Sequence, residues 1–474
     1  MQRAAAMKTA LPRRAVLASP GENSAPASTR PERALILILP TLAALGPLLP
    51  FLGSVFAFRA AALLFFFVVF FRRRPQRSSS VLRTATWALL IIGALAAFVL
   101  SLAHGIDTYA ASELASCFFG AILLIAVLLA RLDRKFIIAL FLGWAASIIV
   151  TGALAAYEMQ TGWRASNYFA NREAESVLTD PGLASTFGNP NDFAYFLLIA
   201  FLILVAGFAV VRKRLVGLLI VAFLVGIAVL IQKTESTLGL VALAIIVLSL
   251  ILARFPHAVI LVAPVIAAGA LLVANSPGGI AGILGVDRSQ VSWFDEGQTG
   301  AIRFNLLGNG MNFALESGFL GLGPGGYEPR TAEGHPYDLA TKGILSPHSA
   351  ALEILSQYGI FVFAATVVVV FHIARAGWRS YRDKSFGRGR QVAGLALVLF
   401  AVLSPLMTMM ASASLEPSYT WMAFASMLVL AMWMTNARAE QPHEAADADE
   451  AGVRESTDRR PLPRGLRQPA APGK

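Results

Sequence analysis

Twelve apolar stretches, each long enough to cross a lipid bilayer, constrain this chain more than any other feature of its sequence. A segment inside a bilayer must satisfy its own backbone hydrogen bonds, so these stretches predict helices. The composition agrees: 56% of the residues are hydrophobic, 14% are charged, and the mean hydropathy is +0.65. We therefore expect an all-α, polytopic membrane protein with about twelve transmembrane helices. The stretches cover residues 34–50, 54–71, 84–103, 110–130, 136–157, 191–211, 215–232, 237–253, 258–275, 349–373, 392–411 and 419–435.

The apolar stretches divide the chain into three parts. Residues 1–33 and 436–474 are rich in Ala, Pro and charged residues, and we expect both to be disordered cytoplasmic tails. Residues 34–435 form the predicted transmembrane domain. Its one large polar insert, residues 276–348, lies between the ninth and tenth stretches. Two neighbouring helices can be joined by far fewer residues, so we expect the chemistry of the protein in this loop.

The charged residues predict how the chain is oriented. The net charge is +11 and the pI about 10.1, and most Lys and Arg lie in short loops on one side: residues 72–77, 131–135, 212–214, 254 and 375–390. The opposite loops contain most of the acidic residues. The positive-inside rule then places both termini in the cytoplasm and the large loop outside. Membrane lipids account for the basic charge, so we expect no nucleic-acid partner.

Two helices predicted to begin on the outer side share a start signal. Asn189-Pro190-Asn191-Asp192 precedes the sixth stretch and Ser346-Pro347-His348-Ser349 the tenth. A polar cap followed by Pro predicts that Asn191 and His348 lie in the first helical turn. A helix amino terminus disfavours a protonated imidazole, so His348 would stay neutral and able to accept a proton. In the alternative interpretation, the Asn-Pro-Asn sequence only caps a helix and His348 only contacts a headgroup or water.

Arg303 is one of the few cations in the outer loop. Its planar guanidinium suits bidentate binding of a phosphate, or else it anchors the loop to lipid headgroups. Apolar residues beside it recur at helical spacing and predict an amphipathic helix near the outer membrane face. The glycine-rich stretch 321–327 lacks the Lys-Ser/Thr of a P-loop, so we expect a tight turn. The apolar residues are Ala301, Phe304, Leu307, Met311 and Ala314.

Three further residues are candidates for substrate contacts. Lys233 and Thr237 are one helical turn apart if the eighth helix begins early, although they could simply form a turn. Glu353, near the outer end of the tenth stretch, is the acidic residue that we expect to be buried in a span, where it could orient the surroundings of His348. The single cysteine, Cys117, excludes an internal disulfide, and the six histidines share no ligand spacing. We therefore predict no metal site and no cofactor.

Taken in order, several sequence pieces resemble the O-antigen ligase/polymerase superfamily of bacterial membrane glycosyltransferases. The similarity runs from Ser185 to the twelfth stretch and looks closest to the branch for teichuronic acid and exopolysaccharide polymerisation. In two places the sequence differs from the family pattern: Ser236-Thr237 stands where Ser-Arg is common, and His348-Ser349 where His-Asn is common. Lys233 would replace the missing cation. The matching pieces are residues 185–194, 234–237, 303–327, 347–348 and 352–359.

The resemblance implies a metal-independent glycosyltransferase of the bacterial cytoplasmic membrane that works in cell-surface polysaccharide biosynthesis. Its donor would be a glycan linked to undecaprenyl diphosphate, and its acceptor a glycan or lipid-linked glycan. Arg303 would bind the diphosphate leaving group, and His348 would orient or deprotonate the acceptor hydroxyl. We expect Asn191, Lys233, Thr237 and Glu353 to contact substrate. Flippase and chain-length regulator proteins are the expected partners.

Two other functions stay open at this point. Twelve spans with both termini inside are also typical of secondary transporters. However, the sixth and seventh stretches are joined only by Arg212-Lys213-Arg214, without the long inner linker between two similar halves. A non-catalytic scaffold in an envelope polysaccharide complex is the second alternative, and the missing Arg at Thr237 favours it. The sequence does not separate ligase from polymerase activity, because both act on lipid-diphosphate-linked glycan.

Overall fold

The computed structural model describes residues 27–52, 55–72, 80–164, 182–187, 189–210, 214–252, 297–335, 338–341, 343–385, 387–409 and 415–435. Within these ranges the regular elements are helices, except for one small antiparallel hairpin, β1 (Pro50–Leu52) with β2 (Val55–Phe56). The expected all-α architecture is therefore confirmed for the described residues. The predicted disordered tail 1–33 is wrong at its end, because residues 30–33 form the first turn of α1, which Thr29 caps. Residues 1–26, the tail 436–474 and the ninth apolar stretch, residues 258–275, lie outside the described residues.

Eleven of the twelve predicted stretches coincide with helices. Among the described residues, five helices are long and apolar enough to cross a membrane, and shorter apolar helices accompany them. This makes the chain a multi-pass membrane protein. The helices are α1 (Arg30–Leu45), α2 (Ala57–Phe70), α3 (Val81–His104), α4 (Thr108–Leu129), α5 (Arg134–Thr161), α7 (Pro190–Val210), α8 (Arg214–Lys233), α9 (Thr237–Ile251), α14 (Ala350–Arg382), α15 (Arg388–Thr408) and residues 418–435.

Two helix ends differ most from the prediction. The first helix stops at Leu45 rather than at residue 50, because Gly46 has a φ of +45° and begins the short 3₁₀ helix η1 (Gly46–Leu48). The chain then turns through the β1–β2 hairpin. At the other extreme, α14 continues to Arg382, nine residues beyond the predicted end. Its last turn contains Arg379 and Arg382, and basic residues of this kind are typical of a helix end at a membrane surface.

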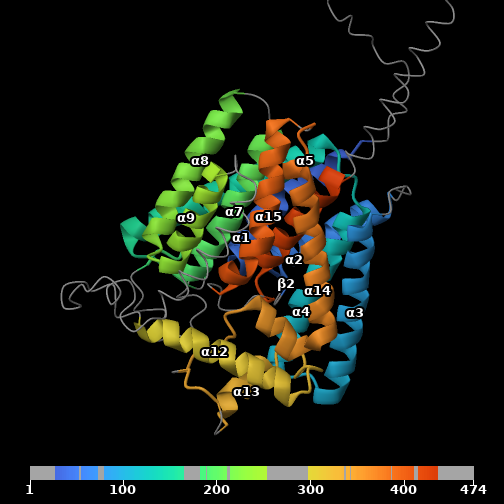
Figure 1. The fold of residues 1–474 in the computed structure, drawn as a ribbon, viewed down its shortest axis with the longest axis vertical. Coiled ribbons are helices and arrows are strands. Elements are labelled where there is room, and N and C mark those ends of the chain that lie inside the picture. Colours follow the sequence, from blue (N-terminus) through green and yellow to red (C-terminus); the bar gives the residue numbers. More distant parts are fainter. Residues whose placement is uncertain are drawn as a thin grey trace, which may run out of the picture.

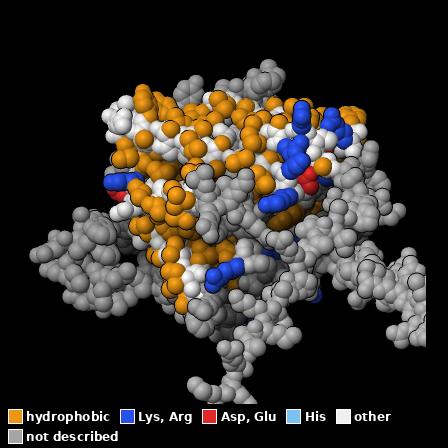
Figure 2. Space-filling view, turned by 90° about the horizontal axis from the view of Figure 1, so that it is seen from above, with side chains coloured by type: hydrophobic (Ala, Val, Ile, Leu, Met, Phe, Trp, Pro, Cys, Tyr) orange, Lys and Arg blue, Asp and Glu red, His pale blue; other side chains and the backbone are white. Residues whose placement is uncertain are grey.

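The helices form an upright bundle whose two ends differ (Figure 1). Helix α12 (Gly297–Glu316) lies across one end, and the short α13 (Tyr327–Glu333) is beside it. The connections from α4 to α5 and from α14 to α15 lie at the opposite end. There, Lys and Arg side chains gather with few acidic side chains among them (Figure 2). The described part of the large polar loop and the basic segments 131–135 and 375–385 are therefore at opposite ends of the bundle.

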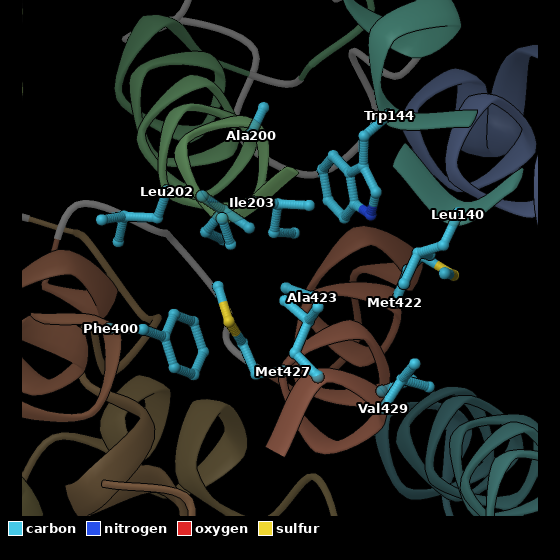
Figure 3. Close-up of a cluster of buried hydrophobic side chains, with 14 of the residues drawn as sticks. Leu140, Trp144, Ala200, Leu202, Ile203, Phe400, Met422, Ala423, Met427 and Val429 are labelled. Carbon is cyan, nitrogen blue, oxygen red and sulfur yellow. The ribbon is translucent and has the colours of Figure 1, made fainter. Parts of the chain in front are cut away.

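The core lies where α5, α7, α15 and helix 418–435 meet (Figure 3). Trp144 of α5 is fully buried, stacks on Phe196 with ring centroids 5.6 Å apart, and donates its indole N–H to Ser426 at 3.0 Å. A buried indole needs such an acceptor. Met422, Met427 and neighbouring aliphatic side chains fill the remaining space. This packing fixes α7 and helix 418–435, whose amino-terminal ends reach the candidate site.

Candidate active site

A break in α14 receives the glycine-rich stretch of the large loop. Gly359 has a φ of +80° and a ψ of −179°, which interrupts the helical hydrogen bonds around it. The carbonyls of Ser356 and Gln357 instead accept the N–H groups of Leu322 and Gly323 at 2.8 and 3.0 Å. The freed N–H of Ile360 donates to the carbonyl of Phe319 at 2.9 Å. The polar groups released by the break are thus satisfied by the loop, as a broken helix at membrane depth requires.

Glycine is required at this junction for steric reasons. A Cβ at Gly321 would lie 2.4 Å from the carbonyl oxygen of Gln357, and a Cβ at Gly359 2.5 Å from that of Leu320. Both glycines also have positive φ values, of +104° and +80°. The expected tight turn is present, because Gly323 and Gly326 are joined by a 3.1 Å backbone hydrogen bond. The stretch additionally interlocks with the tenth predicted span, which the sequence analysis did not foresee.

Tyr327 connects this junction to α12. Its ring is fully buried and lies edge-on to Phe313 at 5.2 Å, and its hydroxyl donates to the Leu306 carbonyl at 2.7 Å. Burial raises the pKa of the Tyr327 hydroxyl, so it stays a donor. At Gly310 of α12 a Cβ would be 3.2 Å from Leu352 of α14, so the two helices pack closely there. Helices α12 and α14, which contain the two predicted catalytic residues or their neighbours, are therefore held together.

Arg330 of α13 links the end of α12 to the segment that precedes His348. Its guanidinium contacts Glu316 at 3.0 Å and Asp338 at 2.9 Å, and lies 4.6 Å from the centre of the Phe313 ring. Partial burial opposes the charge on Asp338, but hydrogen bonds from the His335 amide and from Arg330 lower its pKa below the ordinary value. Partial burial also opposes the charge on Arg330, whereas Asp338 and Glu316 raise its pKa. The cluster ties the end of α12 to the segment that leads to His348.

His348 is placed differently from the prediction. Helix α14 begins at Ala350, and Ser349 is its cap, with its side chain accepting the Leu352 N–H at 3.5 Å. His348 therefore lies before the cap, not in the first turn, and Pro347 is not the first helical residue. Its φ is +46°, a left-handed conformation that histidine tolerates better than most residues. The half-buried imidazole is therefore held at the helix entrance by a strained backbone, and strain of this kind is frequent at functional sites.

Arg303 lies on α12, as predicted, and is half-buried. The predicted helix is confirmed, but its apolar stripe is only partly as expected: Met311 is 42% exposed, whereas Ala314 is buried. The side facing the protein contains Leu306, Gly310 and Phe313, at spacings that place Arg303 on the same face. Arg303 is seven residues before the contact with Leu352, about 10 Å along the axis. Its helix face is thus turned toward α14, the helix that His348 precedes.

Asn191 and the segment 234–237 meet, although they are far apart in the sequence. Helix α7 begins at Pro190 as predicted, and the Asn189 side chain accepts the Asp192 N–H at 2.9 Å. Asn191, in this first turn, accepts the Ser236 hydroxyl at 2.7 Å. Ser236 in turn caps α9 by accepting the Gly239 N–H at 3.2 Å. Two pieces of the resemblance thus join the amino termini of α7 and α9.

Lys233 and Thr237 are not on one helix. Lys233 is the last residue of α8 and Thr237 the first of α9, with Glu235 in a left-handed turn between them at a φ of +58°. The eighth predicted helix does not begin early enough to place them one helical turn apart, because the Ser236 cap starts a new helix; the alternative, a turn between two helices, is the one observed. Both are exposed at the end of the bundle. Whether they contact substrate stays a prediction.

Glu353 lines a small acidic pocket in the first turns of α14. It is 2% exposed, and its Oε1 accepts the Leu415 N–H at 3.1 Å, which joins α14 to the start of helix 418–435. The expectation of a buried Glu353 is confirmed. The pocket holds a space of about 20 Å³, enough for about one small group. Its walls are Tyr109, Glu113, Gly325, Glu328, Pro347, Glu353, Gln357 and Glu416.

Glu113 is a site residue that the sequence analysis missed. It is 4% exposed in α4, so Glu353 is not the one acidic residue buried in a span. Its Oε2 accepts the N–H of Gly325, at 3.0 Å, from the glycine-rich stretch. The signal available was a lone carboxylate within a largely apolar segment. Both carboxylates lie near the amino ends of their helices, whereas carrier sites usually lie at the bilayer midplane, so Glu113 does not favour a transporter.

A comparison with protein families identifies part of this assembly. Residues 228–367 match the family described as O-antigen ligase. This segment is an O-antigen ligase family domain. The resemblance seen in the sequence is confirmed, without assignment to a branch. No curated protein matches the chain.

The O-antigen ligase match covers most of the candidate site. It begins within α8 and ends within α14, so it contains Lys233, Thr237, Arg303, His348 and Glu353. The match also includes the glycine-rich stretch and the Gly359 break that receives it. Asn191 lies outside it but is bonded to Ser236, which lies within. Among the described residues no group of three or more His, Cys, Asp or Glu is arranged to hold a metal ion.

Proposed function

We propose that this membrane protein transfers or polymerises undecaprenyl-diphosphate-linked glycan on the outer side of the cytoplasmic membrane. One observation carries the proposal: an O-antigen ligase domain in which the helix bearing Arg303 packs against the helix that His348 precedes. The family implies a glycosyltransferase that acts on lipid-linked glycan. The diphosphate is already a good leaving group, so fixed cations can stabilise its departure without a metal.

The two predicted catalytic residues have different roles in this proposal. Arg303 binds the diphosphate, and its bidentate geometry matches the phosphate oxygens. His348 accepts the proton of the acceptor hydroxyl. The hydroxyl oxygen forms the new glycosidic bond with the donor sugar as the bond between that sugar and the diphosphate breaks. Asn191, Lys233 and Thr237 border the same end of the bundle, and Glu353 lies in the first turn of α14, four residues after Ser349. We propose these four as substrate contacts.

Two substitutions test the proposal in the native bacterium. A deletion strain carries the gene for the normal chain, Arg303→Ala or His348→Ala, and surface polysaccharide is measured together with the amount of protein in the membrane. We expect each variant to reach the membrane normally and to reduce polymer at least about a hundredfold, the usual contribution of a general base. His335→Ala is the matched control, because His335 is in the same loop and half exposed. Unchanged polymer in both variants contradicts catalysis and favours the scaffold function.

The same strains distinguish polymerase from ligase. Loss of chain length in the deletion strain indicates polymerisation. Accumulation of long lipid-linked chains indicates ligation to a separate acceptor. Both outcomes are compatible with the roles of Arg303 and His348, because the donor is the same.

A further inference from the structure

The acidic pocket beside His348 offers hydrogen-bond acceptors for which the described residues provide no matching donor. Glu113 and Gln357 are 4% and 2% exposed, and both line it. Among the residues that the structure describes, neither Glu113 Oε1 nor Gln357 Oε1 has a partner at hydrogen-bond geometry, although the Tyr358 hydroxyl is close enough to interact with the Glu113 carboxyl group. Buried polar atoms are almost always satisfied, so two such oxygens in one pocket point to a donor that comes from outside.

The charge of the pocket narrows the chemistry of that donor. Glu328, Glu353 and Glu416 complete a wall of four carboxyl groups, and the described lining residues include no Lys, Arg or His. Arg59, the cation that interacts with Glu416, does not line the pocket. Carboxyl groups this close repel one another unless one of them takes up a proton or a positive group lies between them. A protonated primary amine supplies one positive charge and three donors.

The size of the pocket excludes a whole sugar ring from its interior. A space of about 20 Å³ accepts one functional group, such as an ammonium group, while the rest of the ligand stays outside. Pro347 forms part of the wall, so a group bound there is held next to His348. The nearby glycine-rich stretch contributes Gly325, whose N–H fixes Glu113 in place.

We infer that this pocket recognises the protonated amino group of an amino sugar that is not acetylated, within the glycan handled at His348. The inference of an amine site stands on the pocket alone, and its assignment to the glycan rests on the proposed function. The bound ammonium places a neighbouring sugar ring at the entrance of α14. The enzyme would therefore select glycans by a free amine near the reacting hydroxyl.

Binding of simple sugars to the full-length protein in detergent micelles tests the inference. Glucosamine, N-acetylglucosamine and glucose are titrated at slightly acidic pH and followed by ligand-observed NMR. We expect saturable binding of glucosamine and at least about tenfold weaker binding of the other two, since one charge-assisted hydrogen-bond set is lost. Equal binding of glucose and glucosamine, or no binding of glucosamine, overturns the inference.

Isosteric variants locate the site. Glu113→Gln keeps an oxygen for the Gly325 N–H but turns an NH₂ donor toward the pocket, and should weaken glucosamine binding about tenfold. Glu328→Gln, on the short helix α13, provides a second variant outside the bundle if the first does not fold. Glu333→Gln is the matched control, because Glu333 is on the same helix with a 65% exposed side chain. Glucosamine binding that is unaffected by both pocket variants contradicts the site.

The polymer assay separates this inference from the proposed function. If His348→Ala abolishes polymer but glucosamine does not bind, the amine site is wrong and the glycosyltransferase proposal stands. If glucosamine binds through Glu113 and Glu328 but His348→Ala leaves polymer unchanged, the amine site stands and its assignment to a transferred glycan is wrong.

Discussion

Replacing Gly359 by Ala tests whether the broken helix and the glycine-rich stretch form one structural unit. The φ and ψ of Gly359 lie in a region that is essentially restricted to glycine, which costs a side chain about 1 to 3 kcal/mol. The new Cβ would also lie 2.5 Å from the Leu320 carbonyl oxygen, so the loop must move. Three backbone hydrogen bonds cross this junction, and each contributes about 1 kcal/mol. We therefore expect a loss of about 3 kcal/mol or more.

Hydrogen–deuterium exchange of the purified protein measures this loss locally. The amides of Leu322 and Gly323 donate across the junction, and a loss of about 3 kcal/mol makes their exchange roughly a hundredfold faster. Gly93→Ala in α3 is the control, because nothing lies within 4 Å of a Cβ there and its backbone is helical. We expect that variant to be neutral or slightly stabilised. If Gly359→Ala exchanges like Gly93→Ala, the reasoning about the interlock is refuted.

Three further predictions concern contacts around the loop. Arg330→Ala should destabilise the loop by about 1 to 3 kcal/mol, which is measured as faster exchange of the amides in α13. Arg330→Lys should lose less stability because the charge remains. Equal losses in the two variants would contradict this expectation. The lowered pKa of Asp338 stabilises the loop at pH values above about 3.9, and this contribution is lost as the pH falls through the lower folded pKa. Exchange of the amides of His335, Asp338 and Leu339 should thus stay slow at about pH 5 and accelerate below about pH 4. Acceleration already near pH 6 would contradict this. Ser236→Ala removes both the α9 cap and the bond to Asn191, and should lower thermal stability by about 1 to 2 kcal/mol, whereas Ser236→Thr should retain most of it.

The helices were predictable because apolar length and polar boundaries are local properties of the sequence. Pro190 and the Asn189 cap predicted the start of α7 correctly, since the cap contacts only the first turn. The same reasoning failed at His348 because the sequence offers two capping candidates, and Ser349 is the one that accepts the Leu352 N–H. Glu235 has a left-handed backbone and separates α8 from α9, and residue spacing does not reveal this break.

The acidic pocket could not be predicted, because it depends on how distant helices pack. Glu113 and Glu353 are 240 residues apart in numbering and come together only through α4 and α14. Gln357 belongs to a matching sequence piece, but its place in the pocket wall depends on the packing of α14 against α4 and the glycine-rich stretch. The glycine-rich stretch was likewise recognised by composition alone. Its partner in α14 became visible only when the backbone hydrogen bonds were accounted for.

Residues 319–323 and 356–360 are joined by backbone hydrogen bonds, and this limits how the protein can be re-engineered. In a chimaera that carries the large loop of a homologue, the loop residues at 319–323 come from the homologue, whereas their partners at 356–360 are native. Such a graft should function only when the beginning of α14 is transplanted with the loop. The large loop and the beginning of α14 would then have to be replaced together in any variant that is meant to change the substrate.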